Sequence, residues 1–174
     1  ALELNQVLKT ILFGITSEEG LQFNRAFLAL FDENQKQLQG EMAIGPGTRE
    51  DATKIWNNIS RDNIGLEDLF QLRDSAHSAS DIVVNQIVRS LSIPASSQDH
   101  PFIYACRHRA SIIVNGGNAS IDIPAELIRT LNEDTFAIIP LYSPRRPLGV
   151  LIADNFITRE PINEEDIEAL EIFA

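Results

Sequence analysis

Two short apolar segments joined by a polar turn dominate the hydrophobic pattern of this chain. Residues 136–142 and 148–153 are almost unbroken apolar, and the turn 143–147 between them is bracketed by two prolines. Two such segments around a turn of this length predict a β-hairpin. Because neither segment alternates between apolar and polar residues, we expect both faces to be covered and strands 136–142 and 148–154 to be central. Pro140 cannot donate a backbone hydrogen bond, so it predicts a bulge or an unpaired position.

The N-terminal part of the chain predicts a helix followed by another hairpin. Apolar residues recur at steps of three and four over 4–15, the pattern of an amphipathic helix. Residues 25–31 and 37–44 predict two strands with a turn between them. Every second residue from Leu38 to Ile44 shares one predicted face, while the residues between are mostly polar. This alternation predicts a half-exposed strand near an edge of the sheet.

The middle of the chain predicts short elements, and its end predicts one well-marked helix. The expected middle elements are helices at 52–59, 66–72, 82–91, 101–107 and 124–131, a strand at 110–114, and an irregular stretch from Ile93. Near the end, Asn163 and Asp166 have the spacing of a capping box, and Ile162 and Ile167 that of a hydrophobic staple. A final helix is therefore expected to begin after Asn163.

Composition and charge narrow the class of protein. A chain of 174 residues with 44% hydrophobic residues predicts one globular domain with a sizeable core. Its 14 Lys and Arg against 25 Asp and Glu give a net charge of −11, which opposes contact with nucleic acid or an anionic membrane. One cysteine cannot build a disulfide framework, and no signal peptide or membrane span is visible. We therefore expect a cytoplasmic protein. Because the chain lacks an initiator Met, we also expect it to be a fragment of a longer one.

The order of elements and four sequence segments resemble a GAF domain. These segments are NRAFLALFD at 24–32, IPL at 139–141, LGVLIADN at 148–155 and the acidic helix after Pro161. The resemblance spans nearly all of residues 1–174, so it implies a single GAF-like sensor domain. It implies an α+β fold, GAF/PAS-like, with a central antiparallel β-sheet. The terminal helices would cover one face of that sheet and the helical insertions the other, with the first strand beside the last.

The resemblance implies a function in signalling. GAF domains of this kind are sensor modules of bacterial histidine kinases and related two-component regulators. The leading hypothesis is a non-enzymatic domain that binds a small molecule and relays the signal through its terminal helices to a fused output domain. The alternative is a ligand-free dimerisation and signal-relay module. An enzyme ranks third, because the sequence shows no nucleophile, paired-carboxylate or metal constellation.

No cofactor can be identified from the sequence. Phytochrome-type GAF domains hold their bilin through a cysteine followed directly by histidine, whereas Arg107 separates Cys106 from His108 here. A lone cysteine also argues against methionine sulfoxide reduction, which needs cysteines that pair. The dispersed residue set of cyclic-nucleotide-binding GAF domains is not evident. The spacing of the three histidines and Cys106 matches no metal site.

A ligand pocket, where present, is expected under residues 82–124, which mix short helices with the densest basic cluster of the chain. Phe102, Tyr104, His108 and Arg109 are the predicted lining residues, since Arg suits carboxylates and other anions. The alternative is that the aromatic residues belong to the core and the basic residues form a solvated helix end.

The first helix carries more apolar residues than one packing face needs. Leu2, Val7 and Leu12 lie outside its main stripe, and surplus apolar surface on a helix favours association. We therefore predict a homodimer through the first and last helices.

Overall fold

The structure is a computed structural model, and it describes residues 2–16, 23–45 and 79–172. Within these residues six strands form one antiparallel sheet, in the order β3-β2-β1-β6-β5-β4. The strands are β1 (Arg25–Phe31), β2 (Gln37–Ile44), β3 (Ser92–Pro94), β4 (Ile112–Val114), β5 (Phe136–Tyr142) and β6 (Pro147–Asp154). The helices are α1 (Leu2–Thr16), α4 (Ala79–Arg89), α5 (Pro101–His108), α6 (Ala125–Leu131) and α7 (Glu164–Glu171). The helices predicted at 52–59 and 66–72 lie outside the described residues.

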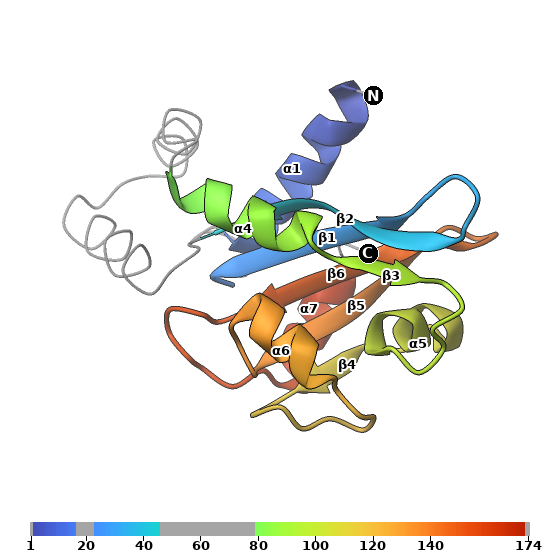
Figure 1. The fold of residues 1–174 in the computed structure, drawn as a ribbon. Helices are drawn as coiled ribbons and strands as arrows, with labels where there is room; N and C mark the ends of the chain where they lie inside the picture. Colours follow the sequence, from blue (N-terminus) through green and yellow to red (C-terminus); the bar gives the residue numbers. More distant parts are fainter. Residues whose placement is uncertain (1, 17–22, 46–78, 173–174) are drawn as a thin grey trace.

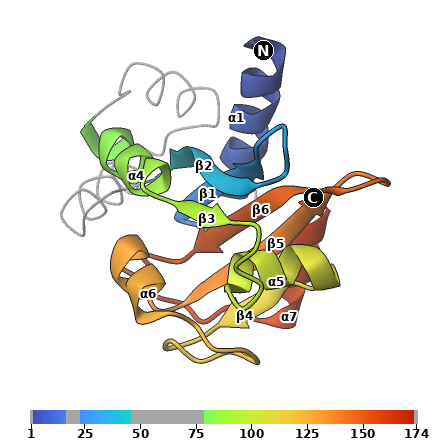
Figure 2. The same ribbon diagram turned by 45° about the vertical axis from the view of Figure 1, so that its right-hand side comes forward.

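The sheet is covered by helices on both faces (Figures 1 and 2). Helices α4, α5 and α6 lie on one face, in front of the strands in Figure 1, and α7 lies behind them. The front side holds the insertion-face core, which includes Phe27, Phe102, Phe136 and Ile152. The opposite side holds the terminal-helix core, to which α1 and α7 contribute. This is the predicted α+β arrangement, with terminal helices on one face and insertions over the other.

The central hairpin is confirmed. Strand β6 pairs with β1 on one side and with β5 on the other, so the first strand also lies beside the last. Residues 136–140 and 149–154 are buried. Alternate residues of these strands enter the two cores, as Ile138 and Ile139 do. Pro140 pairs in register with Val150 of β6, so no bulge lies there, and the register shifts later, between Leu141 and Tyr142. On its other side the pairing with β4 covers residues 136–138 and does not include Pro140, which is thus unpaired on that side.

The predicted alternation of β2 was wrong beyond Gly40, because a β-bulge interrupts it. Leu28 pairs with Met42 and Ala29 with Gly40, so Glu41 is an extra residue on β2. One extra residue reverses which side chains face which core. Leu38 therefore lies in the insertion-face core, whereas Met42 packs against the terminal-helix core.

The edge of the sheet beside β2 also differs from expectation. Of the stretch predicted to be irregular, Ile93 and Pro94 belong to β3, which pairs with residues 37–39, whereas residues 95–100 form no helix or strand, as expected. Beyond β3, helix α4 and the residues that follow it lie against β2. The amide of Gly40 donates to the carbonyl of Leu91, just after α4, at 2.9 Å. The Asn85 side chain accepts from the Ala43 amide and donates to its carbonyl, both at 3.1 Å. Backbone groups of this near-edge strand are thus bonded without a full neighbouring strand.

The predicted start of the last helix is confirmed. The Asn163 side chain accepts from the Asp166 amide, and the Asp166 carboxylate accepts from the Asn163 amide, both at 3.0 Å. Ile162 and Ile167 are both buried in the terminal-helix core.

In the described part of the chain, no helix combines the length and apolarity needed to cross a bilayer.

Candidate functional site

Helix α5 carries three of the four residues predicted to line a ligand site, and the fourth, Arg109, directly follows it. Local chemistry sets both ends of the helix. Pro101 stands in its first turn, where a missing amide costs nothing. His100 precedes it in extended conformation, and its Nδ1 accepts a hydrogen bond from the Phe102 amide at 3.1 Å. At the other end Arg109 adopts the left-handed conformation, with φ 48°, and the helix stops. At this end of the helix Arg107, His108 and Arg109 are exposed.

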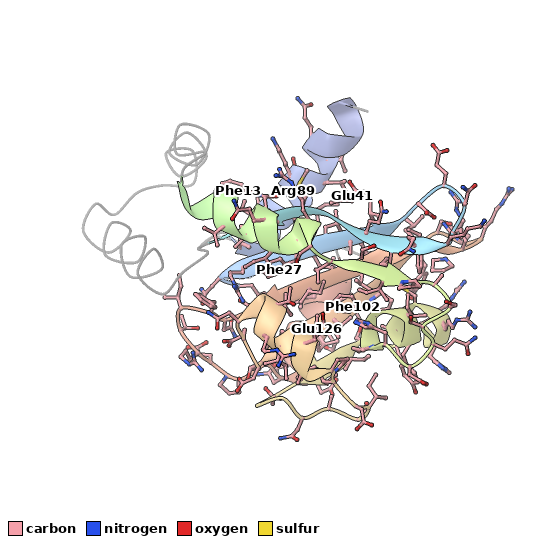
Figure 3. The ribbon with its side chains drawn as sticks, in the orientation of Figure 1. Phe13, Phe27, Glu41, Arg89, Phe102 and Glu126 are labelled. Atoms are coloured by element: carbon pink, nitrogen blue, oxygen red, sulfur yellow. The ribbon has the colours of Figure 1, made fainter. Side chains whose placement is uncertain are left out.

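The structure separates Phe102 from the other three predicted residues. Phe102 is completely buried in the insertion-face core, and Figure 3 labels it between the sheet and its covering helices. Tyr104 is half-buried, and His108 and Arg109 are exposed. Phe102 is therefore a core residue that a ligand at the surface cannot reach, whereas the other three side chains are accessible to solvent.

Tyr104, His108 and Arg109 take part in two ring contacts at the C-terminal end of α5, one of which involves a residue that the sequence analysis missed. The rings of Tyr104 and His108 lie with their centroids 4.1 Å apart. The guanidinium carbon of Arg109 lies 4.7 Å from the centroid of the Tyr142 ring, at the end of β5. We call these four residues the aromatic–basic cluster. No sequence signal pointed to Tyr142, because only the packing of α5 beside β5 brings it to Arg109.

The surface around this cluster has the chemistry to hold an anion with a flat apolar part. Tyr142 is 43% exposed, and Leu148, near the start of β6, is 40% exposed. Arg107 is exposed on the same helix. An Arg guanidinium binds carboxylates through paired hydrogen bonds, and aromatic rings add stacking area. The cluster is therefore the described region that best fits the predicted anion contact.

Cys106 faces away from this cluster and into the protein. It is 4% exposed, and its Sγ donates to the carbonyl of Gly149 at 3.3 Å. Burial raises the pKa of the thiol to about 12. Since the thiolate is the reactive form, Cys106 is protonated and a poor nucleophile at neutral pH.

The sequence analysis also missed a buried ion pair. It lies between β1 and β6, at the end of these strands away from Tyr142. Arg25 and Asp154 are both fully buried and pair across these strands. Arg25 donates from Nη2 to Asp154 Oδ2 at 2.6 Å and to the carbonyl of Leu131 at 2.7 Å. Its guanidinium carbon also lies 3.9 Å from the centroid of the Phe156 ring. The pair ties α6 to the sheet, and its only sequence signal is a charged residue at the end of each apolar strand.

A surface cleft lies beside β4 and α7, away from the aromatic–basic cluster. It has a volume of about 320 Å³, and none of the four predicted residues lines it. Its lining residues are Ser111, Ile112, Ile113, Ser120, Glu164, Ile167 and Glu171. No group of His, Cys, Asp and Glu side chains within the described ranges is arranged to hold a metal ion.

Comparison with known proteins identifies the fold. No family model matches the sequence, and no curated protein matches it either. Among solved structures, the GAF domain of a two-component sensor histidine kinase from Bacillus halodurans superposes with a TM-score of 0.59 at 14% identity, over 99% of this chain and 89% of that one. A methyl-accepting chemotaxis protein gives 0.59 at 14% identity, covering 99% and 83%. A GAF domain/HD domain protein from Geobacter sulfurreducens gives 0.57 at 9% identity, covering 97% and 84%. The described chain therefore has the fold of GAF domains.

Proposed function

We propose that this chain is a regulatory sensor domain of a signalling protein, which responds at the aromatic–basic cluster and relays the response through α1 and α7. The fold shared with a GAF domain of a sensor histidine kinase supports this role. The proposal assigns no catalysis to the domain itself, in keeping with the protonated state of Cys106. The output domain would be fused to it, as in a histidine kinase, and the whole would act in the cytoplasm.

The proposal rests on one observation: the same sheet separates the two cores and contributes side chains to both of them. Helix α5 packs on the insertion-face core, while α1 and α7 pack on the terminal-helix core. Strands β1, β5 and β6 supply alternate side chains to both. A ligand that favours one position of α5 would therefore shift these strands and bias the arrangement of the terminal helices, which is a population shift between two states.

The ligand class follows from the cluster. Arg107, His108 and Arg109 supply donors and positive charge in an acidic protein, and Tyr104 and Tyr142 supply ring faces. We infer a small organic anion with an aromatic or planar part as the ligand, held at the surface end of α5.

One observation favours the second candidate, a ligand-free relay module. The space between the sheet and helices α4 to α6 is occupied by the domain's own side chains, including Phe27, Phe102 and Phe136, all fully buried. On this alternative the domain would transmit changes arriving through one terminal helix to the other.

Native mass spectrometry of protein purified from cells separates the two candidates. A sensor should retain a small molecule, and Arg109→Ala should release it. Arg145→Ala removes the same charge from the exposed hairpin turn and should leave the complex intact. The sensor proposal fails when no molecule is retained and aromatic carboxylates such as benzoate leave the melting temperature unchanged. The ligand-free relay would then be the better account.

A further inference from the structure

Residues 155–160, which we call the connector, lead from the end of β6 toward α7 and fold into a closely bonded turn. The Arg159 amide donates to the carbonyl of Asn155 at 2.7 Å, and the Asn155 side chain donates to the carbonyl of Glu160 at 3.0 Å. Arg159 adopts the left-handed conformation, with φ 58°. Because the two ends of the connector are bonded to each other, a displacement of one end would be carried to the other.

The connector is also bonded to the start of β1. Oδ1 of Asn24 accepts from the amides of Ile157 and Thr158, at 2.7 and 3.0 Å. The Asn24 amide donates to the carbonyl of Asp154, directly before the connector, at 2.9 Å. The carboxylate of Asp154 accepts from the Phe156 amide at 3.2 Å. Asn24 and Asp154 therefore hold the connector against the end of the sheet.

The C-terminal end of α6 meets the same connector. Arg25 donates from Nη2 to the carbonyl of Leu131, the last residue of α6, and its guanidinium carbon lies 3.9 Å from the centroid of the Phe156 ring. Just after the helix, Oε2 of Glu133 lies 3.9 Å from Nη1 of Arg159, in a second ion pair. Two contacts thus join the end of α6 to the connector, one through the buried Arg25 and one through the partly exposed Arg159.

The two helices at the ends of this path belong to different layers. Leu127 and Leu131 of α6 are buried in the insertion-face core. Ile162, two residues after the connector, and Ile167 of α7 are buried in the terminal-helix core. In Figure 1 the chain after β6 passes beside α6 before it reaches α7 behind the sheet. The connector therefore leads from one layer of helices to the other around the end of the sheet.

We propose that the connector couples α6 to α7, so that a displacement of the C-terminal end of α6 moves the start of α7. This inference rests on the proposed function and adds to it a route around the end of the sheet instead of through its strands. Nη1 of Arg25 is buried and has no hydrogen-bond partner in the described part of the chain. Because a buried donor without an acceptor is costly, a displacement of α6 that brings a carbonyl to Nη1 would be favoured. The junction then has two arrangements between which a signal can select.

The test compares two matched perturbations in ¹⁵N–¹H correlation spectra of the whole chain. Ile128 of α6 and Ile87 of α4 are both half-buried and pack against the insertion-face core. Ile128→Ala should shift the amide signals of residues 155–160 and 164–171. Its shifts in α7 should be at least twice those caused by Ile87→Ala. A smaller ratio, or no shift in α7 from Ile128→Ala, would overturn the proposal.

Removal of the connector's own bonds tests its part in the coupling. Asn24→Ala removes the acceptor of two connector amides and should at least halve the shifts that Ile128→Ala causes in α7. Asn24→Asp keeps an acceptor oxygen at this position and should preserve these shifts. Unchanged shifts in Asn24→Ala, or an equal loss in Asn24→Asp, would refute the coupling.

Arg159→Gly decides the test should Asn24→Ala not fold. This change removes the second contact with α6 from an exposed position, and glycine suits the left-handed backbone there. It should also reduce the shifts in α7, and unchanged shifts would count against the proposal. No ligand is used, so the outcome is independent of the test of the proposed function. Coupling without a retained small molecule would favour the ligand-free relay, whereas a retained molecule without coupling would leave the sensor role and remove this route.

Discussion

At the residue scale, the buried pair of Arg25 and Asp154 is the contact on which one end of the sheet depends. Each charge lies completely out of water, and each is compensated by the other. Asp154 also accepts from the amide of Phe156 at 3.2 Å, so the pair orients the chain as it leaves β6. A buried pair of this kind contributes little net stability over an apolar pair, but removal of one partner is costly.

Asp154→Asn should therefore lower the free energy of unfolding by about 3–5 kcal/mol, because Arg25 would keep its buried charge without a counter-charge. Urea unfolding followed by circular dichroism measures the loss. The double variant Arg25→Met/Asp154→Leu removes both charges and should be more stable than Asp154→Asn. A single variant within about 1 kcal/mol of the wild type would contradict the role of the pair.

His100 should make stability depend on pH. Burial lowers the pKa of its imidazole from 6.5 to about 4 in the folded protein. As pH falls from about 6.5 toward 4, the unfolded chain binds a proton that the folded one does not, so the free energy of unfolding should decrease over this range. His100→Asn keeps a side-chain acceptor at the helix N-cap but cannot titrate. Its stability should fall less over the same range in urea unfolding at a series of pH values. Equal slopes in the two proteins would disprove the assignment.

At the element scale, the close packing of α4 on β2 depends on a residue without a side chain. A Cβ atom at Gly40 would lie 1.7 Å from the carbonyl oxygen of Val88, which no real contact permits. The absent side chain lets the C-terminal end of α4 approach the strand, and the chain after α4 then supplies the Leu91 carbonyl to the Gly40 amide. Helix and strand thus share hydrogen bonds that a neighbouring strand would otherwise provide.

Gly40→Ala should separate α4 from β2 and destabilise the domain by about 1–3 kcal/mol, the usual cost of overpacking. Thermal or urea unfolding measures the change. Gln39→Ala, at an exposed position on the same strand, should change stability by less than about 0.5 kcal/mol. If the two variants were equally stable, α4 would not depend on contact at Gly40.

At the scale of the whole molecule, the terminal helices carry the features that fit association. The N-terminal part of α1 projects beyond the sheet in Figure 1. Of the three apolar residues that suggested a surplus, Leu12 is buried in the terminal-helix core, Val7 is 54% exposed, and the side chain of Leu2 lies outside the description. Ile172, directly after α7, is 83% exposed. We infer that α1 and α7 of two copies pair through this surface, as symmetric dimers commonly do.

Val7→Glu should therefore shift the protein from dimer to monomer in sedimentation velocity at micromolar concentration, because a charge would be buried at the interface. Gln6→Glu adds the same charge to the neighbouring exposed position and should leave the dimer intact. A wild-type protein that is monomeric at every accessible concentration would refute the dimer.

The sequence alone determined those elements whose hydrophobic pattern or capping residues lie within the element itself and match the way it packs. The almost unbroken apolar segments 136–142 and 148–153 predicted two central strands, because neither segment alternates with polar residues that could form a solvent-facing side. The cap and staple around Asn163 act within one helical turn, so they place the start of α7 without any distant contact. Together with the GAF resemblance, these signals predicted the fold and both layers of helices.

Only the tertiary structure decided the features that depend on residues distant in the chain. The bulge at Glu41 is invisible in the sequence, since strand periodicity assumes that no residue is skipped by the neighbouring strand. Tyr142 joins Arg109 only because α5 packs beside the end of β5. Arg25 and Asp154, 129 positions apart, neutralise each other through the pairing of the first and last strands. Periodicity reports which side of an element is apolar, whereas a site requires knowing which elements become neighbours.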